Sequence, residues 1–275
     1  MAGMLKGTLE LIEKYKNSHP HYVELLGILE EVLILRESYR HNMTEDIFPV
    51  NEDIIEKKLS GGLPLIDFSG GDFDLTEPQR YFLELLKIAE KQDPKEIREL
   101  SGKIEDGTID FKKMIRNFFT IDEDISEEQE YEFLDLIELF IEESLRPALE
   151  IVAEKYGRVI AKAGWSEGYC PICGSEPKIG ELREEEGQRF LFCSQCGFEW
   201  SFTRIKCPFC GNEEQRTLAY FTVEDDEMRR VDVCNACKRY IKTVDSRAAK
   251  GEANLEVEAI ATLHLDMLAS EEGYI

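Results

Sequence analysis

Cysteine is absent from most of the chain, since all eight cysteines lie between positions 170 and 237 of the 275 residues. No apolar run reaches the 18–20 residues that a membrane-spanning helix needs. Residues 1–10 hold no apolar run followed by a cleavage site, so we expect no signal peptide and a cytoplasmic location. A cytoplasmic chain keeps its thiols reduced, which argues against disulfides as the role of the cysteines.

Motifs of the common enzyme classes are missing as well. The chain has no P-loop, no G-x-G-x-x-G run and no Ser/His/Asp arrangement. The acidic run from Asp122 to Glu132 is expected to be a solvated helix face. A solvated or capping role is the default for the four scattered histidines, His19, His21, His41 and His264. We therefore expect a binding protein and not an enzyme.

A basic surface of domain size is also lacking. The net charge is −24, divided as −16 over residues 1–164, −4 over 165–245 and −4 over 246–275. Nucleic-acid binding needs a basic face that neutralises phosphates, so we expect no nucleic-acid partner. A zinc-ribbon nucleic-acid-binding protein stays as the alternative because seven cations could form a local patch: Arg204, Lys206, Arg229, Arg230, Lys238, Arg239 and Lys242.

The cysteines form four C-x-x-C pairs. Two intervening residues let one tight turn aim both thiolates at one metal, and four sulfurs form the tetrahedral site that suits zinc or a rubredoxin-type iron. A thioredoxin-like role would need a single pair opening a helix. A thiol or sulfur-transfer enzyme would need one pair free of metal. Two metal ions are therefore predicted on Cys170, Cys173, Cys193, Cys196, Cys207, Cys210, Cys234 and Cys237.

The spacing of the pairs suggests an internal duplication. The first and third gaps between pairs, residues 174–192 and 211–233, each have room for a two-stranded ribbon. Strand-like runs surround the second and fourth pairs, at 189–192, 198–202, 229–233 and 239–244. The simplest pairing joins the first pair with the second and the third with the fourth, while a cross-braced pairing stays open. Each site is closed, which favours a scaffold over metal-centred hydrolysis.

The remaining sequence has helical periodicity. Stripes of apolar residues predict helices at 3–18, 20–41, 76–92 and 110–119, a shorter one from Pro94 to Gly107, and one from the Ser126 region to Ala163. Thr76-Glu77-Pro78-Gln79 and Ser126-Glu127-Glu128-Gln129 resemble capping boxes. Pro147 is expected to kink or divide the last helix. A final helix is expected at about 254–269.

These patterns predict an α+β fold. An all-α domain (1–164) would precede two tandem rubredoxin-like or zinc-ribbon units with four cysteines each (165–205 and 206–245). The C-terminal helix (246–275) would pack on them.

Particular sequence elements carry a family resemblance. They are Tyr169-Cys-Pro-Ile-Cys-Gly-Ser-Glu-Pro177, Gly187-Gln-Arg-Phe-Leu-Phe-Cys-Ser-Gln-Cys196, Glu199-Trp200, Arg204, Cys207-Pro-Phe-Cys-Gly211, Cys234-Asn-Ala-Cys-Lys-Arg-Tyr-Ile-Lys242 and Ala259-Ile-Ala-Thr-Leu-His-Leu-Asp266. Residues 165–275 thereby resemble the formate dehydrogenase accessory (formation) proteins of the FdhE type. The family's Asn-Pro-Phe-containing tail is not found in residues 1–275.

The resemblance implies a cytoplasmic assembly protein for molybdenum- or tungsten-containing formate dehydrogenase. It would bind the catalytic subunit before the cofactor-loaded enzyme is released or exported. The resemblance also implies rubredoxin-like sites associated with iron, on the eight cysteines named above. We expect turns such as Phe198-Glu199-Trp200 to be exposed, and Trp200 and Arg204 to be candidate partner contacts because Trp and Arg are common interface anchors. Packing of Trp200 as ordinary core is the competing interpretation. The choice of iron or zinc and the oligomeric state, homo-oligomer included, are left open.

Overall fold

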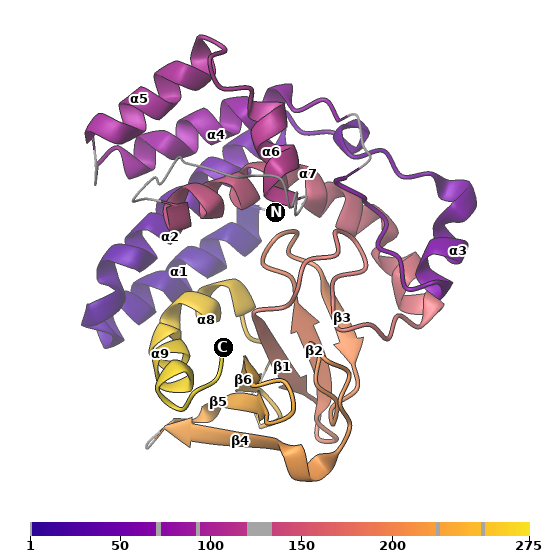
Figure 1. Cartoon of the computed structure of the whole chain (residues 1–275). Helices are drawn as coiled ribbons and strands as arrows, with labels where there is room; N and C mark the ends of the chain where they lie inside the picture. The colour runs from indigo at the N-terminus through magenta and orange to yellow at the C-terminus, as the bar shows by residue number, and fades with distance from the viewer. Residues whose placement is uncertain (1, 70–72, 92–93, 120–133, 224–225, 249–250) are drawn as a thin grey trace.

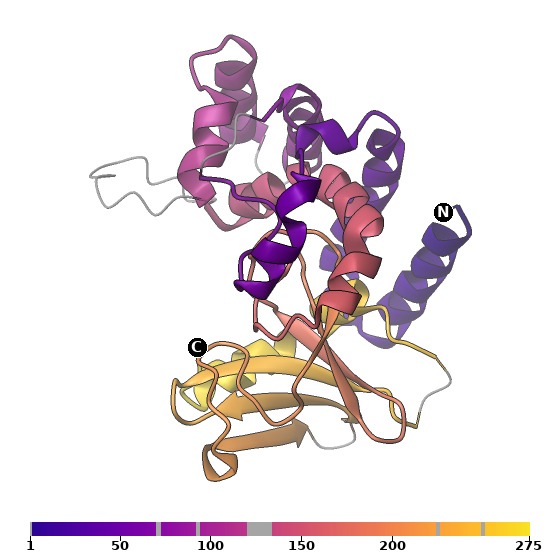
Figure 2. The same cartoon turned by 90° about the vertical axis from the view of Figure 1, so that its right-hand side faces the viewer.

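A layer of helices lies over a single mixed sheet in the computed structural model (Figure 1). The structure describes the whole chain except residues 1, 70–72, 92–93, 120–133, 224–225 and 249–250. The view turned by 90° shows the same two layers, with the sheet below the helices (Figure 2). The predicted α+β class is therefore confirmed.

Except for α3 (Ile55–Ser60), which was not predicted, the helical layer follows the predicted stripes. Its helices are α1 (Ala2–Ser18), α2 (Val23–Arg40), α3 (Ile55–Ser60), α4 (Thr76–Ala89), α5 (Pro94–Glu105), α6 (Phe111–Phe119) and α7 (Leu134–Ala163). The prediction of a capping box at Thr76 is wrong, because Leu75 is the N-cap and the Thr76 hydroxyl donates to Asp74 Oδ1 over 2.6 Å. The capping box at Ser126 lies outside the described residues.

Of the two outcomes expected at Pro147, a kink or a division, the division does not occur, because α7 continues through this residue. Loss of one backbone hydrogen bond is tolerated here because the helix packs tightly around the proline. Ser144, Leu145, Ala148 and Leu149 are each 0% exposed.

The six strands form one sheet, in the order β3-β2-β1-β6-β5-β4. The strands are β1 (Ile179–Arg183), β2 (Gln188–Phe192), β3 (Glu199–Phe202), β4 (Leu218–Val223), β5 (Asp226–Cys234) and β6 (Arg239–Asp245). Each ribbon is antiparallel within itself. The two ribbons join edge to edge where β1 pairs in parallel with β6, Ile179 opposite Lys242 and Leu182 opposite Asp245.

The C-terminal helix expected at 254–269 is two helices, α8 (Leu255–Ala261) and α9 (Leu263–Glu271). Asn254 caps α8 by accepting the Val257 N–H, and the chain leaves helical geometry at Thr262 (φ −117°, ψ 21°). The break changes the buried face, so Met267 is 67% exposed whereas Leu265 and Ala269 are buried. Both helices cover one face of the sheet, where Val231 and Val233 pack against α9.

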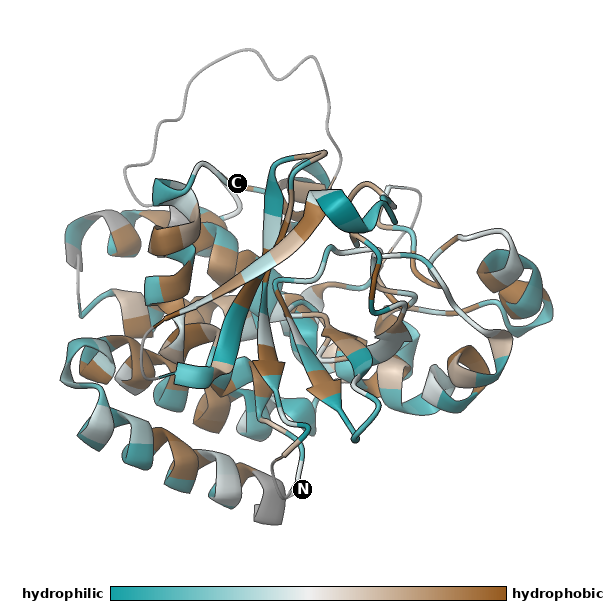
Figure 3. Cartoon of the chain, turned by 90° about the horizontal axis from the view of Figure 1, so that it is seen from below, coloured by the Kyte–Doolittle hydropathy of each residue, from teal (hydrophilic) through white to brown (hydrophobic). Residues whose placement is uncertain are grey.

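The main core does not stop at the edge of the helical layer. It combines buried residues of α4 and α7 with Cys170, Cys173, Leu191 and Trp200 of the first ribbon. The division into four domains stays a prediction. Among the described residues, no helix is both long and apolar enough to cross a membrane. Figure 3 shows hydrophobic and hydrophilic residues interspersed along the helices.

Candidate metal centres

The four C-x-x-C turns share one backbone arrangement. In the first turn the Gly174 N–H donates to Cys170 O (2.9 Å) and the Cys170 N–H donates to Ser175 O (2.9 Å). The second and third turns repeat both bonds, with Gly197 and Gly211 in place of Gly174. These glycines have φ near +70° to +81°, where a side chain would be strained. Lys238 takes this position in the fourth turn, with φ 62°.

The first cluster joins the first and second turns. Cys170 Sγ lies 3.4 Å from Cys196 Sγ, and Cys173 Sγ lies 3.5 Å from Cys193 Sγ. All four sulfurs lie within 4.8 Å of one another. A metal with bonds of about 2.3 Å to four sulfurs would give S–S separations of about 3.8 Å, whereas a disulfide would need about 2 Å. The donor set therefore fits one tetrahedral metal ion.

The helical layer encloses this first cluster. Each of its cysteines is at most 6% exposed. Leu65 and Ile66 donate their backbone N–H groups to Pro171 O and Ile172 O, each over 2.9 Å. From α7, Arg146 Nη1 donates to Ser194 O over 2.7 Å, and Glu142 O accepts from Gln195 Nε2 over 2.7 Å. The first cluster is thus part of the core of the molecule.

The second cluster joins the third and fourth turns. Cys207 Sγ lies 3.7 Å from Cys237 Sγ, and Cys210 Sγ lies 3.8 Å from Cys234 Sγ. Its geometry fits a tetrahedral metal equally well, but its surroundings differ, since Cys210 is exposed and Cys237 half-buried. The structure thus groups the first C-x-x-C pair with the second and the third pair with the fourth, and not in the cross-braced way.

Burial and mutual contacts shift the pKa values of the clustered thiols in both directions. Burial raises the pKa of the Cys170 and Cys196 thiols, and it raises the pKa of Cys207 to about 12. Burial also acts to raise the pKa of Cys234, but the N–H groups of Cys237 and Ala236 outweigh it and lower that pKa to about 7. Four clustered thiolates need a positive ion between them, which a divalent or trivalent metal supplies.

A close backbone contact holds the two clusters together. A Cβ atom at Gly168, just before the first turn, would lie 1.8 Å from Pro208 O in the third turn. Arg239 adds a bidentate ion pair to Glu176, with N–O distances of 2.8 and 2.6 Å. The role of Gly168 was not predicted, because a lone glycine in sequence gives no sign of which backbone approaches it.

The predicted partner contacts lie in different places. Trp200 is 4% exposed and donates its indole N–H to Glu167 O over 3.2 Å, which is the core position weighed as the alternative. The expectation that Phe198-Glu199-Trp200 forms an exposed turn is wrong, because β3 begins at Glu199 and Phe198 packs against the main core. Arg204 is exposed, and its Nη1 donates to Glu186 O over 3.1 Å.

The seven cations proposed as a local patch do not form one face. Arg229 and Lys242 lie on the side of α8 and α9, where they pair with Glu258 and Asp266. Lys206, Arg230 and Arg239 also have carboxylate partners, at 3.8, 2.9 and 2.6 Å. The charge on these side chains is thus largely compensated within the chain, and nothing here supports nucleic-acid binding.

Comparison with known proteins places this geometry in a family. The family model described as "FdhE, central domain" matches residues 169–204, and the model described as "FdhE, C-terminal domain" matches residues 205–275. A protein FdhE homolog of Aquifex aeolicus is 30% identical over 272 residues, covering 97% of this chain and 91% of its own. The chain belongs to the FdhE family. An FdhE homolog of Pseudomonas aeruginosa is 37% identical over 119 residues, covering 40% of this chain and 38% of its own.

The crystal structure of an FdhE protein from Pseudomonas aeruginosa has the same fold. It matches with a TM-score of 0.69 at 21% identity, covering 97% of this chain and 90% of that chain. The FdhE fold therefore extends over the helical layer, where sequence motifs gave no basis for a family assignment.

Proposed function

We propose that this protein is an accessory protein of formate dehydrogenase. It binds the catalytic subunit of a molybdenum- or tungsten-containing enzyme before the cofactor-loaded enzyme is released or exported, and it acts in the cytoplasm. The observation that carries the proposal is the similarity to an FdhE homolog over 97% of the chain, together with the two four-cysteine clusters inside the FdhE-matched regions.

Two metal ions, iron or zinc, belong to this proposal. Cys170, Cys173, Cys193 and Cys196 would hold one, and Cys207, Cys210, Cys234 and Cys237 the other. Four thiolates leave no open coordination position for substrate, so the metals fix the turns and we propose no catalytic role for them. An iron site would in addition allow a change of redox state without a change of ligands.

The test is capture of the protein from its own host under anaerobic conditions, followed by identification of the proteins bound to it. A formate dehydrogenase catalytic subunit is the expected partner. Recovery of nucleic acid, or of an unrelated complex alone, would contradict the assignment. A variant unable to fill the second cluster, Cys207→Ser, should show whether capture depends on the metal.

A further inference from the structure

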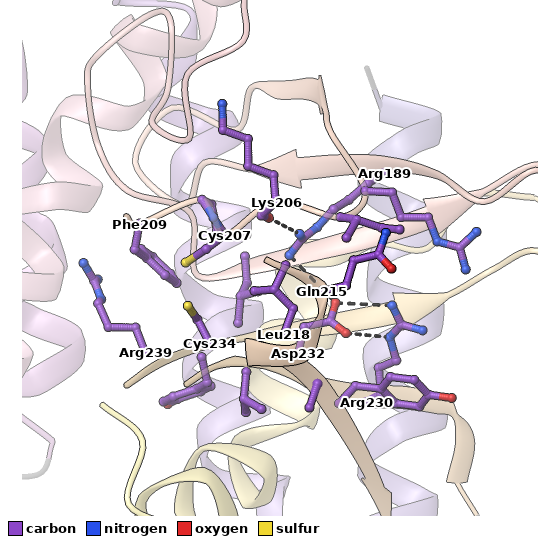
Figure 4. Close-up of a pocket in the computed structure, with 18 residues that line it drawn as sticks. Arg189, Lys206, Cys207, Phe209, Gln215, Leu218, Arg230, Asp232, Cys234 and Arg239 are labelled. Atoms are coloured by element: carbon purple, nitrogen blue, oxygen red, sulfur yellow. Dashed lines mark hydrogen bonds and ion pairs between the residues drawn. The ribbon is translucent and has the colours of Figure 1, made fainter. Parts of the chain in front are cut away.

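A pocket of about 340 Å³ opens on the sheet face opposite α8 and α9 (Figure 4). Strands β4, β5 and β6 line it together with Arg189 of β2, and one of its walls is the second cluster, through Cys207 and Cys234. Nothing in the proposed function uses it. Two residues of the family motifs, Arg189 and Arg204, converge on it from different segments.

Cationic side chains outnumber carboxylates among the residues that line this pocket. Asp232 is the single carboxylate among the lining residues. The five cations that line the pocket are Arg189, Arg204, Lys206, Arg230 and Arg239. Lys206 and Arg239 pair with Glu213 and Glu176 outside the lining, so Arg189 and Arg204 are the cations of this pocket that remain open to an added anion.

The carboxylate of Asp232 is shared among several groups. Its Oδ1 lies 2.9 Å from Arg230 Nε, and its Oδ2 accepts from the Thr243 hydroxyl over 2.8 Å. Arg189 Nη2 approaches Asp232 only to 3.8 Å. The buried guanidinium of Arg189 and the partly exposed one of Arg230 therefore share one carboxylate, and Arg189 has the longer contact with it.

Arg189 is the less well paired of the two arginines. It is 4% exposed, and its Nη1 donates to Lys206 O over 3.1 Å. Its Nε and Nη2 atoms are buried and have no hydrogen-bond acceptor among the described residues. Burial lowers the pKa of Arg189, as expected for a cation with too little compensation.

Arg36 shows how this chain satisfies a buried arginine elsewhere. In Arg36 the same two atoms, Nε and Nη2, donate to the carboxylate of Glu143, with Nε–Oε1 and Nη2–Oε2 distances both of 2.6 Å. Glu256 adds a second carboxylate at 2.8 Å. Since a buried charge without a partner is costly, the comparison indicates that the carboxylate for Arg189 comes from another molecule.

The rim of the pocket fits a peptide better than a small ion. Ile205 and Tyr220 line it and are 48% and 61% exposed. Tyr220 belongs to β4, which is an edge strand of the sheet, so that among the described residues no strand pairs with its outer side and a peptide could add there. Arg204 has no ion pair within the part of the chain that the structure describes.

We propose that this pocket binds an extended peptide segment of a partner, carrying an Asp or Glu side chain next to an aromatic or aliphatic one. The carboxylate of the peptide pairs with Arg189 and Arg204, and its apolar side chain packs on Ile205 and Tyr220. The inference rests on the proposed function in that the segment belongs to the formate dehydrogenase catalytic subunit.

The first experiment needs no known partner. Short random peptides displayed on phage are selected on the full chain, and the enriched peptides are measured by fluorescence anisotropy. They should contain Asp or Glu beside an aromatic or aliphatic residue. Arg204→Glu should weaken their binding about tenfold or more, whereas Arg158→Glu, an equal charge change on exposed α7 surface, should change it by less than about twofold. Peptides without acidic residues, or equal binding by both variants, would overturn the proposal.

Arg189→Met separates binding from stability. Removal of a buried guanidinium whose Nε and Nη2 atoms lack acceptors should leave the Tm unchanged or raised, while the acidic peptides no longer bind. A lower Tm would assign Arg189 to the fold, and unchanged peptide affinity would remove it from the pocket. Either result contradicts the ligand role.

Capture of the catalytic subunit distinguishes the two proposals. If wild type captures the subunit and Arg204→Glu captures it as well as Arg158→Glu does, the pocket inference fails and the proposed function stands. If acidic peptides bind the pocket but wild type captures no formate dehydrogenase subunit, the pocket stands and the proposed function fails.

Discussion

The first cluster lies within the main core, in contact with the helical layer, whereas the second is more open, with Cys210 exposed and Cys237 half-buried. Both are built from the same turn, with the same backbone hydrogen bonds and similar sulfur separations. The difference comes from what surrounds each turn. Equal donor sets therefore do not imply equal roles: the first cluster supports the core, and the second borders the charged pocket.

The largest effect should come from breaking the first cluster. Cys193→Ser should lower the free energy of unfolding by about 5 kcal/mol or more, because it removes a metal from inside the core. Cys210→Ser should cost less and leave the helical layer folded, since Cys210 lies at the surface. The stability and the metal content of both variants are measured, the first by thermal unfolding. A serine variant that still holds two metal ions would refute the ligand assignment.

Gly168→Ala tests the contact between the clusters. Its Cβ would overlap Pro208 O, so the second cluster must move away at a cost of about 3 kcal/mol or more. Gly102→Ala is the control, because Gly102 in α5 has open space at its Cβ position and should be neutral or slightly stabilising. Urea unfolding of the two variants compares them. Equal stability would show that the clusters do not depend on this contact.

Glu256 probes the surroundings of the first cluster through pH, because it pairs with Arg36 and with Arg146, which donates to Ser194 O in the second turn. Burial acts to raise its pKa, but the Arg146 and Arg36 guanidinium groups outweigh burial and lower the pKa to about 2. A lowered carboxylate pKa contributes stability above the unfolded value of about 4.3, and that stability is lost as pH falls towards 2.

The expected contribution of Glu256 is about 3 kcal/mol at neutral pH. Glu256→Gln should remove it and flatten the loss of stability between about pH 5 and pH 2. Glu272→Gln, on the exposed end of the chain, is the matched control and should follow wild type. If both variants show the wild-type acid profile, Glu256 is not the group that responds.

Lys238→Gly should give the smallest effect. Lys238 has φ 62°, a conformation that glycine adopts without strain, so the variant should be more stable by about 1 kcal/mol. Gly211→Lys makes the reverse change in the third turn, where its Cβ meets only the Lys206 side chain at 3.9 Å, and should lose about as much. Changes of the same sign in the two variants would contradict the common turn geometry.

Local features of this fold were predictable from sequence. The C-x-x-C spacing predicted four equivalent turns, and the runs at 189–192, 198–202, 229–233 and 239–244 each coincide with a strand. The helical stripes located α1, α2, α4, α5 and α6. These features depend on neighbours within a few residues, which local patterns encode.

Long-range features were not predictable in this way. The parallel pairing of β1 with β6 joins segments about 60 residues apart and leaves no mark in either strand. The break at Thr262 and the burial of Trp200 depend on what packs against them. The sequence contains the motif with Gly187 and Arg189, but only the fold shows that Arg189 and Arg204 meet at one pocket.

The most direct test of the difference between the clusters is metal release. The anaerobically purified chain should hold two metal ions by native mass spectrometry. Under excess chelator one should leave faster than the other by roughly tenfold or more, because only the second cluster is reachable without opening the core. Cys210→Ser should lack the fast phase and keep the slow one. A single ion per chain, one common rate, or loss of the slow phase in Cys210→Ser would contradict the account.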